Sequence, residues 1–138
     1  MSAKTRANLV LVEPGVTASP ALGAATDQNH LLFLGADEPL AGFQERVRRR
    51  ASAMKRSSQE LCEVIYLVGS SSNANWHTRQ QLLAELCDEV EPQGSVALHA
   101  PSSALTDVFS CIQDLSTSVA PGVSLRAVFT DVREAVVA

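Results

Sequence analysis

The chain has 138 residues, 46% hydrophobic and 19% charged. This size and composition suit one globular α/β domain over residues 1–138, with a core large enough to fold without disulfide bridges or a structural metal. A formal net charge of −4 argues against nucleic acid as the main partner, and no apolar run approaches the roughly 18 residues of a membrane span. The charged start is followed by only a short apolar stretch, unlike a signal peptide, and the three Cys residues are widely spaced. Reduced thiols and a cytoplasmic location are therefore expected.

The first part of the chain predicts two strands that are separated by a long connector. Residues 1–7 are expected to be disordered, and a first strand covers Leu9–Val12. Pro14 and Gly15 end it, because neither residue favours continuation of a strand. The connector spans residues 14–30, long enough to indicate a functional loop or a short helical turn. A second strand covers Leu31–Leu34.

A long amphipathic helix is predicted from about residue 38 to 55. Asp37 is the expected N-cap, and Pro39 is tolerated in the first turn. Acidic residues at the start and basic residues at the end agree with the helix dipole. The apolar stripe that should face the core recurs at spacings of three and four and consists of Leu40, Phe43, Val47, Ala51 and Met54.

The second half alternates strands and helices. Strands are predicted at residues 64–68, 95–99 and 123–129. A helix begins near Trp76, with Asn73 or Asn75 as its cap, and another follows Ser102 or Ser103. The helix after Trp76 should bury Leu83, Leu86, Cys87 and Val90, and the next one Leu105, Val108, Phe109, Ile112 and Leu115. A short helix is expected after Asp131.

This alternation predicts an α/β fold, a three-layer open sheet of five mainly parallel strands with helices on both faces and right-handed crossovers. Ligands of such sheets bind outside the carboxyl ends of the strands. The polar residues expected at this edge are Asp37, Ser70, Ser71, Ser72, Asn73, His77 and His99. Hydroxyl groups, backbone N–H groups and a helix N-terminus after Gly69 favour an anion or nucleotide. The same residues would also simply cap a helix and fill a turn.

An alternative is a small hydrolase that uses the Ser70–Asn73 loop with His99. The residue types suit a nucleophile and a base. However, Asn73 stands where a nucleophile elbow, G-x-S-x-G, has its second glycine. No His/Cys pair has the spacing of metal ligands, so neither a metal nor another cofactor is expected. A non-catalytic regulatory or interaction domain is the leading hypothesis.

The order from the second to the fifth strand resembles that of STAS domains, the anti-sigma-factor antagonists. In that family a Ser/Thr in an Asp-Ser-Ser/Thr-Gly turn is phosphorylated, whereas the matching turn here, Ser70–Asn73, lacks both Asp and Gly. Val68-Gly69-Ser70 is similar to a short piece of universal stress proteins, whose later glycines are absent. Receiver domains share the size and alternation, but the third strand here does not end in Asp.

Six cations and one acid lie between Glu45 and Arg56 in an otherwise acidic chain. Residues 1–59 carry eight Lys/Arg and five Asp/Glu, while residues 60–138 carry three and ten. On a helix, one broad flank contains Arg46, Arg49, Arg50 and Arg56, with Arg48 and Lys55 turned away. A solvated helix face is the simplest explanation. The functional alternative is a docking surface for an acidic protein partner or for a second copy's acidic half.

Overall fold

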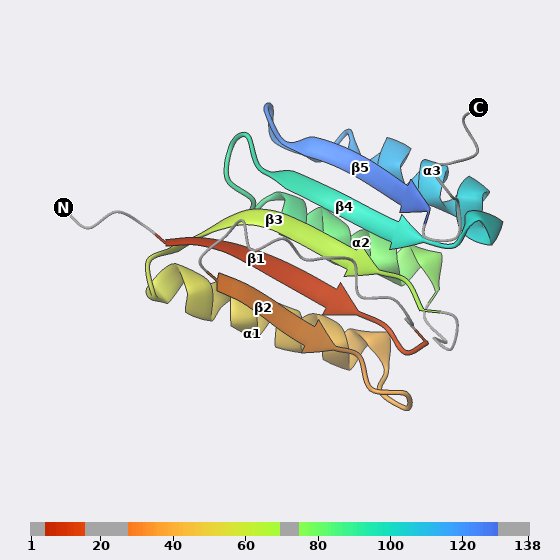
Figure 1. Cartoon of the computed structure of the whole chain (residues 1–138), viewed down its shortest axis with the longest axis horizontal. Helices are drawn as coiled ribbons and strands as arrows, with labels where there is room; N and C mark the ends of the chain where they lie inside the picture. Colours follow the sequence, from red (N-terminus) through yellow and green to blue (C-terminus); the bar gives the residue numbers. More distant parts are fainter. Residues whose placement is uncertain (1–4, 16–27, 70–74, 130–138) are drawn as a thin grey trace, which may run out of the picture.

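The computed structural model describes residues 5–15, 28–69 and 75–129. Five strands pair in the order β2-β1-β3-β4-β5, and every neighbouring pair is parallel (Figure 1). The elements are β1 (Thr5–Val12), β2 (Gln28–Phe33), α1 (Leu40–Arg56), β3 (Gln59–Leu67), α2 (Trp76–Cys87), β4 (Ser95–Ala100), the 3-10 helix η1 (Ser102–Ala104), α3 (Leu105–Leu115) and β5 (Ser124–Phe129). The predicted open, parallel, five-stranded α/β sheet is confirmed.

The three helices pack on the same face of the sheet (Figure 1). Their buried side chains share one large cluster with one set of strand residues, whereas a smaller cluster on the other face contains only strand residues. The crossovers β2-α1-β3, β3-α2-β4 and β4-α3-β5 all proceed in one direction across the sheet, so right-handed connections place their helices together. The predicted helical layer on the second face would have to come from residues outside the described ranges.

The central strands are apolar on both faces, and the side chains on both faces are buried. Leu9, Val10 and Leu11 of β1 are fully buried, and Tyr66 lies equally deep in β3. Such continuous apolar runs are typical of strands in the middle of a parallel sheet. The edge strand β5 instead alternates exposed and half-buried residues.

Strand boundaries differ from the predicted ones at the start of the chain. β1 begins at Thr5, so residues 5–7 belong to the sheet and are not disordered. β2 begins at Gln28, which removes residues 28–30 from the predicted connector. In both cases backbone pairing with a neighbouring strand extends a polar segment that has no apolar pattern of its own.

α1 has the predicted stripe but not the predicted cap. Phe43, Val47 and Met54 are buried. The helix is preceded by Pro39, which provides no side-chain cap, so the expectation that Asp37 caps it was wrong. α2 follows the prediction, since the Asn75 side chain accepts a hydrogen bond from the Thr78 backbone N–H at 2.8 Å.

α3 is rotated relative to its predicted stripe. Val108, Cys111 and Leu115 are buried, while Leu105 and Phe109 are exposed. The predicted Ser caps were also wrong, because Ser102 and Ser103 lie in η1 and the helix follows Ala104 without a side-chain cap. The cause is the position of α3 at the sheet edge, where it packs against β4, β5 and α2. Two thiols, Cys87 and Cys111, are buried, and Cys62 is half-buried.

Candidate functional site

The strand order changes direction between β1 and β3. The chain leaves β1 toward β2 on one side and leaves β3 toward β4 on the other. Ligands of open α/β sheets bind at the carboxyl ends of the strands that flank such a switch point. The last described residues at these two ends are Glu13–Gly15 after β1 and Val68–Gly69 after β3. This edge is therefore the place where the topology favours a site.

A buried ionic cluster lies at the switch point. Both carboxylate oxygens of Glu13 accept a hydrogen bond from the Arg79 guanidinium, from Nε and from Nη2, each at 2.7 Å. Glu13 Oε1 also accepts from the Gly69 backbone N–H at 3.1 Å, and Oε2 accepts from the Tyr66 hydroxyl. Side chains of Glu13 and Arg79 are 0% and 5% exposed, so the pair is almost completely removed from water.

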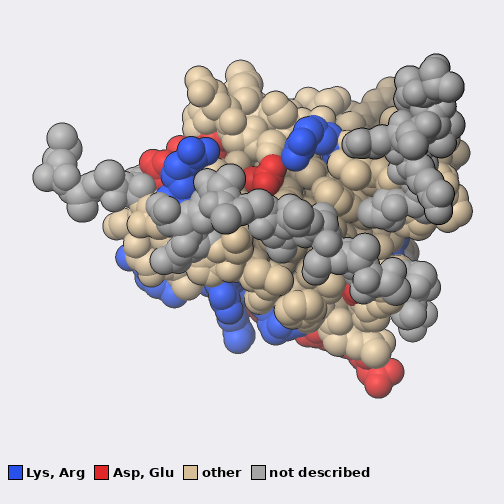
Figure 2. Space-filling model, viewed as in Figure 1, with Lys and Arg blue, Asp and Glu red and all other residues tan. Residues whose placement is uncertain are grey.

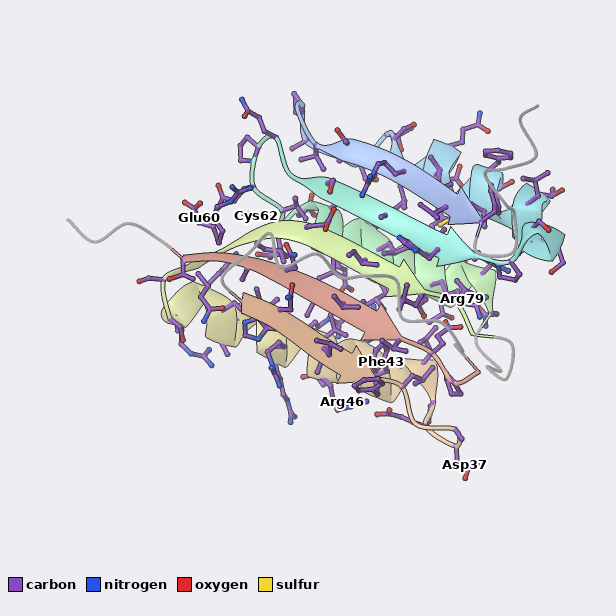
Figure 3. The ribbon with its side chains drawn as sticks, in the orientation of Figure 1. Asp37, Phe43, Arg46, Glu60, Cys62 and Arg79 are labelled. Carbon is purple, nitrogen blue, oxygen red and sulfur yellow. The ribbon has the colours of Figure 1, made fainter. Side chains whose placement is uncertain are left out.

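This cluster joins three elements that are distant in sequence. Glu13 follows β1, Tyr66 lies near the end of β3, and Gly69 follows it. Arg79, labelled in Figure 3, is in the first turn of α2. A guanidinium–carboxylate pair with two parallel bonds fixes orientation as well as distance. The start of α2 is thereby held against the ends of the two strands that flank the switch point.

The environment keeps Tyr66 and Arg79 protonated. Burial, and then the negative charge of Glu13, raise the pKa of Tyr66 far above its usual range, so its hydroxyl remains a donor. Burial by itself lowers the pKa of Arg79, but the hydrogen bonds and charge of Glu13 raise that pKa overall. The Arg79 guanidinium also lies 4.6 Å from the ring centre of Trp76, a cation–π contact.

Gly69 allows the backbones after β1 and β3 to approach closely. A Cβ atom at residue 69 would lie 1.8 Å from the carbonyl oxygen of Pro14 and 2.9 Å from that of Glu13. No side chain fits at such distances. The glycine that ends the predicted third strand is therefore required by the close passage of the chain at Pro14.

A hollow of about 440 Å³ adjoins the cluster at the carboxyl edge. Its walls are Pro14 after β1, the loop between β2 and α1, and the N-terminal residues Asn75 and Thr78 of α2. Two other hollows, of about 280 and 240 Å³, lie beside α1 away from this edge. The first turns of α1 and α2 thus border one concave space. The first backbone N–H groups of a helix have no partner within the helix, so such turns can donate hydrogen bonds to a ligand.

The predicted ligand residues do not all meet at this hollow. Asp37 contributes to its lining, but its side chain projects from the tip of the β2–α1 loop into solvent (Figure 3). His77 is exposed on the first turn of α2, and neither His77 nor His99 lines the hollow. Residues Ser70, Ser71, Ser72 and Asn73 lie outside the described residues. Their assignment to the site stays a prediction.

His99 is half-buried near the end of β4, on the sheet face without helices. It is paired in register with Leu67, a member of the smaller cluster on that face. Burial is the largest cause that lowers the pKa of His99, and the positive charge of Arg126 adds to it. Among the described residues no carboxylate is bonded to His99, so the structure assembles no catalytic set around it there.

The basic residues of α1 separate into two flanks, as predicted. On the side of α2, Arg48 donates to both carboxylate oxygens of Glu85 at 2.9 and 2.6 Å, and Lys55 pairs with Glu89. On the side of β2, Arg46 donates to both oxygens of Glu38 at 2.9 and 2.7 Å.

Arg46 and Arg50 also serve the edge strand β2. Arg46 Nη2 donates to the backbone carbonyl of Phe33 at 2.6 Å, and Arg50 Nη1 lies 3.2 Å from Nδ1 of His30. The bond from Arg46, followed by the bond from the Gly35 N–H, lowers the pKa of Glu38. Arg46 is therefore engaged with the loop and with β2, whereas Arg49 pairs with Glu45 at 3.6 Å on the exposed side of α1 and Arg56 is exposed.

Glu13 directly follows the predicted first strand, but no pattern in the sequence pairs it with Arg79. The available signal was the position of Arg79 on the buried stripe of α2, ahead of Leu82, Leu83 and Leu86. A charged residue on such a stripe requires a buried counter-ion, and the acid directly after a buried strand is a natural candidate.

No protein-family model, curated protein or solved structure matches this chain. The resemblances to STAS domains and universal stress proteins therefore gain no support. Over residues 5–15, 28–69 and 75–129, no group of three or more His, Cys, Asp or Glu could hold a metal ion. Within the same ranges, no helix has the length and apolar character required to cross a bilayer.

Proposed function

We propose that this chain is a non-catalytic regulatory or protein-interaction domain that senses a small anion or nucleotide at the carboxyl edge of its sheet. The observation that carries the proposal is the hollow of about 440 Å³ beside the switch point, between the starts of α1 and α2. Its volume is within the range of small-molecule sites, roughly 300–1,000 Å³. The location is the one that ligands of open α/β sheets use.

The polar groups at this edge suit a ligand with negative charge. The starts of two helices carry partial positive charge, and α2 is the better placed because Asn75 fixes its first turn. Glu38 is neutralised by Arg46 and Asp37 projects into solvent, which reduces their repulsion of an anion. Ser70–Asn73 directly follow Gly69, whose N–H is anchored on Glu13, and would add hydroxyl and backbone donors.

The buried cluster supports a binding role rather than a catalytic one. The Glu13 and Arg79 side chains are bonded to each other, and Glu13 also accepts from the Gly69 backbone N–H, so both side chains are already engaged within the molecule. Their fixed geometry serves instead to hold the edge in one conformation. In this proposal the signal passes to a protein partner that contacts the β2-side flank of α1, with Arg46, Arg49, Arg50 and Arg56 as its basic residues.

Thermal denaturation with and without ligand tests the proposal. Phosphate, AMP, GMP and their diphosphates are the probes, and a ligand at a hundred times its Kd contributes about 2.7 kcal/mol to the stability of the folded state. Ser71→Asp should abolish the effect by placing a competing charge in the turn. Ser110→Asp adds the same charge on α3, beside the edge strand β5 and away from the hollow. This variant should keep the ligand-induced rise in melting temperature.

Two outcomes would reject this function. No stabilisation by any probe at millimolar concentration would remove the ligand-sensing part. Covalent labelling of Ser70 or Ser71 by a serine-directed fluorophosphonate, with loss of labelling in His99→Ala, would favour the hydrolase. One observation favours the hydrolase: the lowered pKa of His99 leaves its ring neutral and able to accept a proton, as a general base requires.

A further inference from the structure

The edge strand β5 is open to pairing with a further strand. The Ser124 backbone N–H donates to the Gly94 carbonyl at 3.0 Å, on the side of β4. Backbone groups alternate between the two sides of a strand, so the N–H and C=O of Leu125, Ala127 and Phe129 point away from β4. In the part of the chain that the structure describes, no strand lies beyond β5. An edge of this kind is a template for another strand.

The opposite edge strand, β2, is protected against such pairing. The Leu34 backbone N–H donates to the Val12 carbonyl at 2.8 Å, on the side of β1, so the neighbouring carbonyl of Phe33 points outward. Arg46 Nη2 donates to this carbonyl at 2.6 Å, and Glu38 holds the guanidinium in place. A charged side chain at an edge strand hinders pairing with another strand. Extension of the sheet is therefore favoured at β5.

Exposed apolar side chains lie on both sides of the β5 edge. On the helix side, Phe109 of α3 contacts Phe129 of β5 edge-on, with ring centres 6.0 Å apart, and is still 55% exposed. Leu105 lies one turn before Phe109 on the same flank of α3 and is 44% exposed. Val128 precedes Phe129, points to the helix-free face and is 37% exposed. These four residues form one contiguous apolar border, which is typical of an interaction surface.

The charged residues near this border are directed away from it. Arg126 of β5 reaches across β4 to Glu63 of β3, with Nη2 3.2 Å from Oε2. Asp107 and Asp114 are exposed on the flank of α3 opposite the apolar one. Figure 2 shows mainly uncharged side chains along the upper border, where β5 lies in Figure 1, whereas Lys and Arg gather along the lower border. A second copy of the same border would therefore meet no excess of like charge.

Two-fold symmetry restricts the register in which two β5 strands pair. Opposite residues of an antiparallel pair share one face of the sheet, so the axis passes through a residue. An axis at Arg126 would place two arginines opposite each other. An axis at Ala127 places Arg126 opposite Val128 and Leu125 opposite Phe129. In this register the outward backbone groups of Leu125, Ala127 and Phe129 all face outward groups of the other copy, and each opposite pair exchanges both of its hydrogen bonds.

We infer that two copies of this chain pair through their β5 edges, antiparallel about a two-fold axis at Ala127, and join their sheets into one. The helices of both copies then lie on the same face, where the two α3 helices contact each other through Leu105 and Phe109. An interface of this symmetry is closed, so association stops at the dimer. The hollow and the basic flank of α1 stay free, so the inference goes beyond the proposed function and does not depend on it.

Sedimentation velocity over a range of protein concentrations is the first measurement. The average mass should rise with concentration toward that of a dimer and no further. As the dimer forms, hydrogen exchange of the Leu125, Ala127 and Phe129 amides should slow, while that of Phe33 at the β2 edge stays unchanged. A monomer even at millimolar concentration, growth beyond the dimer, or slowed exchange at β2 instead of β5 would overturn the inference.

The variants Val128→Lys and Val128→Glu test the register. Both remove the same apolar side chain, but in the inferred register residue 128 lies opposite Arg126 of the other copy. Lysine there meets a like charge and glutamate an opposite one, and symmetry makes the contact twice. The Kd of the lysine variant should therefore be about tenfold higher than that of the glutamate variant, and added salt should reduce the difference. Equal Kd values for the two variants would exclude this pairing.

Three further variants separate the backbone from the side chains. Ala127→Pro removes an N–H that makes no bond to β4, so the monomer should fold and the dimer should be lost. Phe109→Ser should weaken the dimer, whereas Phe33→Ser, which removes a ring of similar exposure at the opposite edge, should not. Far-UV circular dichroism checks each fold, and the two Val128 variants decide if Ala127→Pro does not fold. The inference is wrong if folded Ala127→Pro still dimerises, or if Phe109→Ser dimerises as well as Phe33→Ser.

Discussion

Replacing Arg79 with methionine should destabilise the protein strongly, since it leaves the Glu13 carboxylate buried without its counter-ion. The carboxylate would lose two charged hydrogen bonds of 2.7 Å and keep only those from Gly69 and Tyr66. Bonds to charged groups contribute about 1.5–3 kcal/mol each, and breaking a buried pair costs about 3–5 kcal/mol. We expect a loss of about 4 kcal/mol, a large part of a typical stability of about 5–15 kcal/mol.

Urea denaturation followed by far-UV circular dichroism measures this loss. Tryptophan fluorescence is less suitable, because Trp76 contacts Arg79 directly. The midpoint should decrease with little change in the slope m. Arg126→Met is the matched control: it removes an Arg–Glu63 pair whose arginine side chain is 57% exposed, and should cost less than about 1 kcal/mol.

A second variant separates the lost pair from the altered packing. In Glu13→Gln with Arg79→Met no buried charge remains, so the double variant should be more stable than Arg79→Met alone. The reasoning is refuted if Arg79→Met costs no more than Arg126→Met, or if Glu13→Gln makes the Arg79→Met protein still less stable. Either result would show that Glu13 is not a desolvated charge that requires Arg79.

The other two predictions concern the same edge of the sheet. Tyr66, the only tyrosine, keeps its proton when folded and releases it at about pH 10 when unfolded, so stability should fall as pH rises above about 10. Tyr66→Phe should lose about 1–2 kcal/mol at neutral pH and lack that part of the alkaline decline, as measured by urea midpoints from pH 7 to 11. An unchanged decline in the variant would contradict this assignment. Gly69→Ala should cost about 3 kcal/mol or more by pushing apart the backbones at Pro14, whereas Gly42→Ala, whose nearest contact is a side-chain oxygen at 3.9 Å, should gain about 0.5 kcal/mol. Equal melting temperatures of the two glycine variants would disprove the close approach.

The sequence by itself determined the elements that depend on local pattern. The run Val64–Val68 and its glycine gave a central strand, since a parallel sheet buries both faces of its inner strands. The spacing of Phe43, Val47 and Met54 determined which face of α1 is buried, and Asn75 determined where α2 begins. Neighbours within a few residues of one another decide these features.

Contacts between distant segments were decided only by the tertiary structure. Glu13 and Arg79 are 66 positions apart and meet because β1 and β3 are adjacent in the sheet, which no local pattern encodes. The rotation of α3, with Phe109 outside and Cys111 inside, follows from its position beside the edge strand β5, where Phe109 contacts Phe129 edge-on and stays 55% exposed. The same holds for the basic run of α1. Periodicity placed Arg46 and Arg49 on one flank, but only the path of β2 brings the Phe33 carbonyl within reach of Arg46 and leaves Arg49 in solvent.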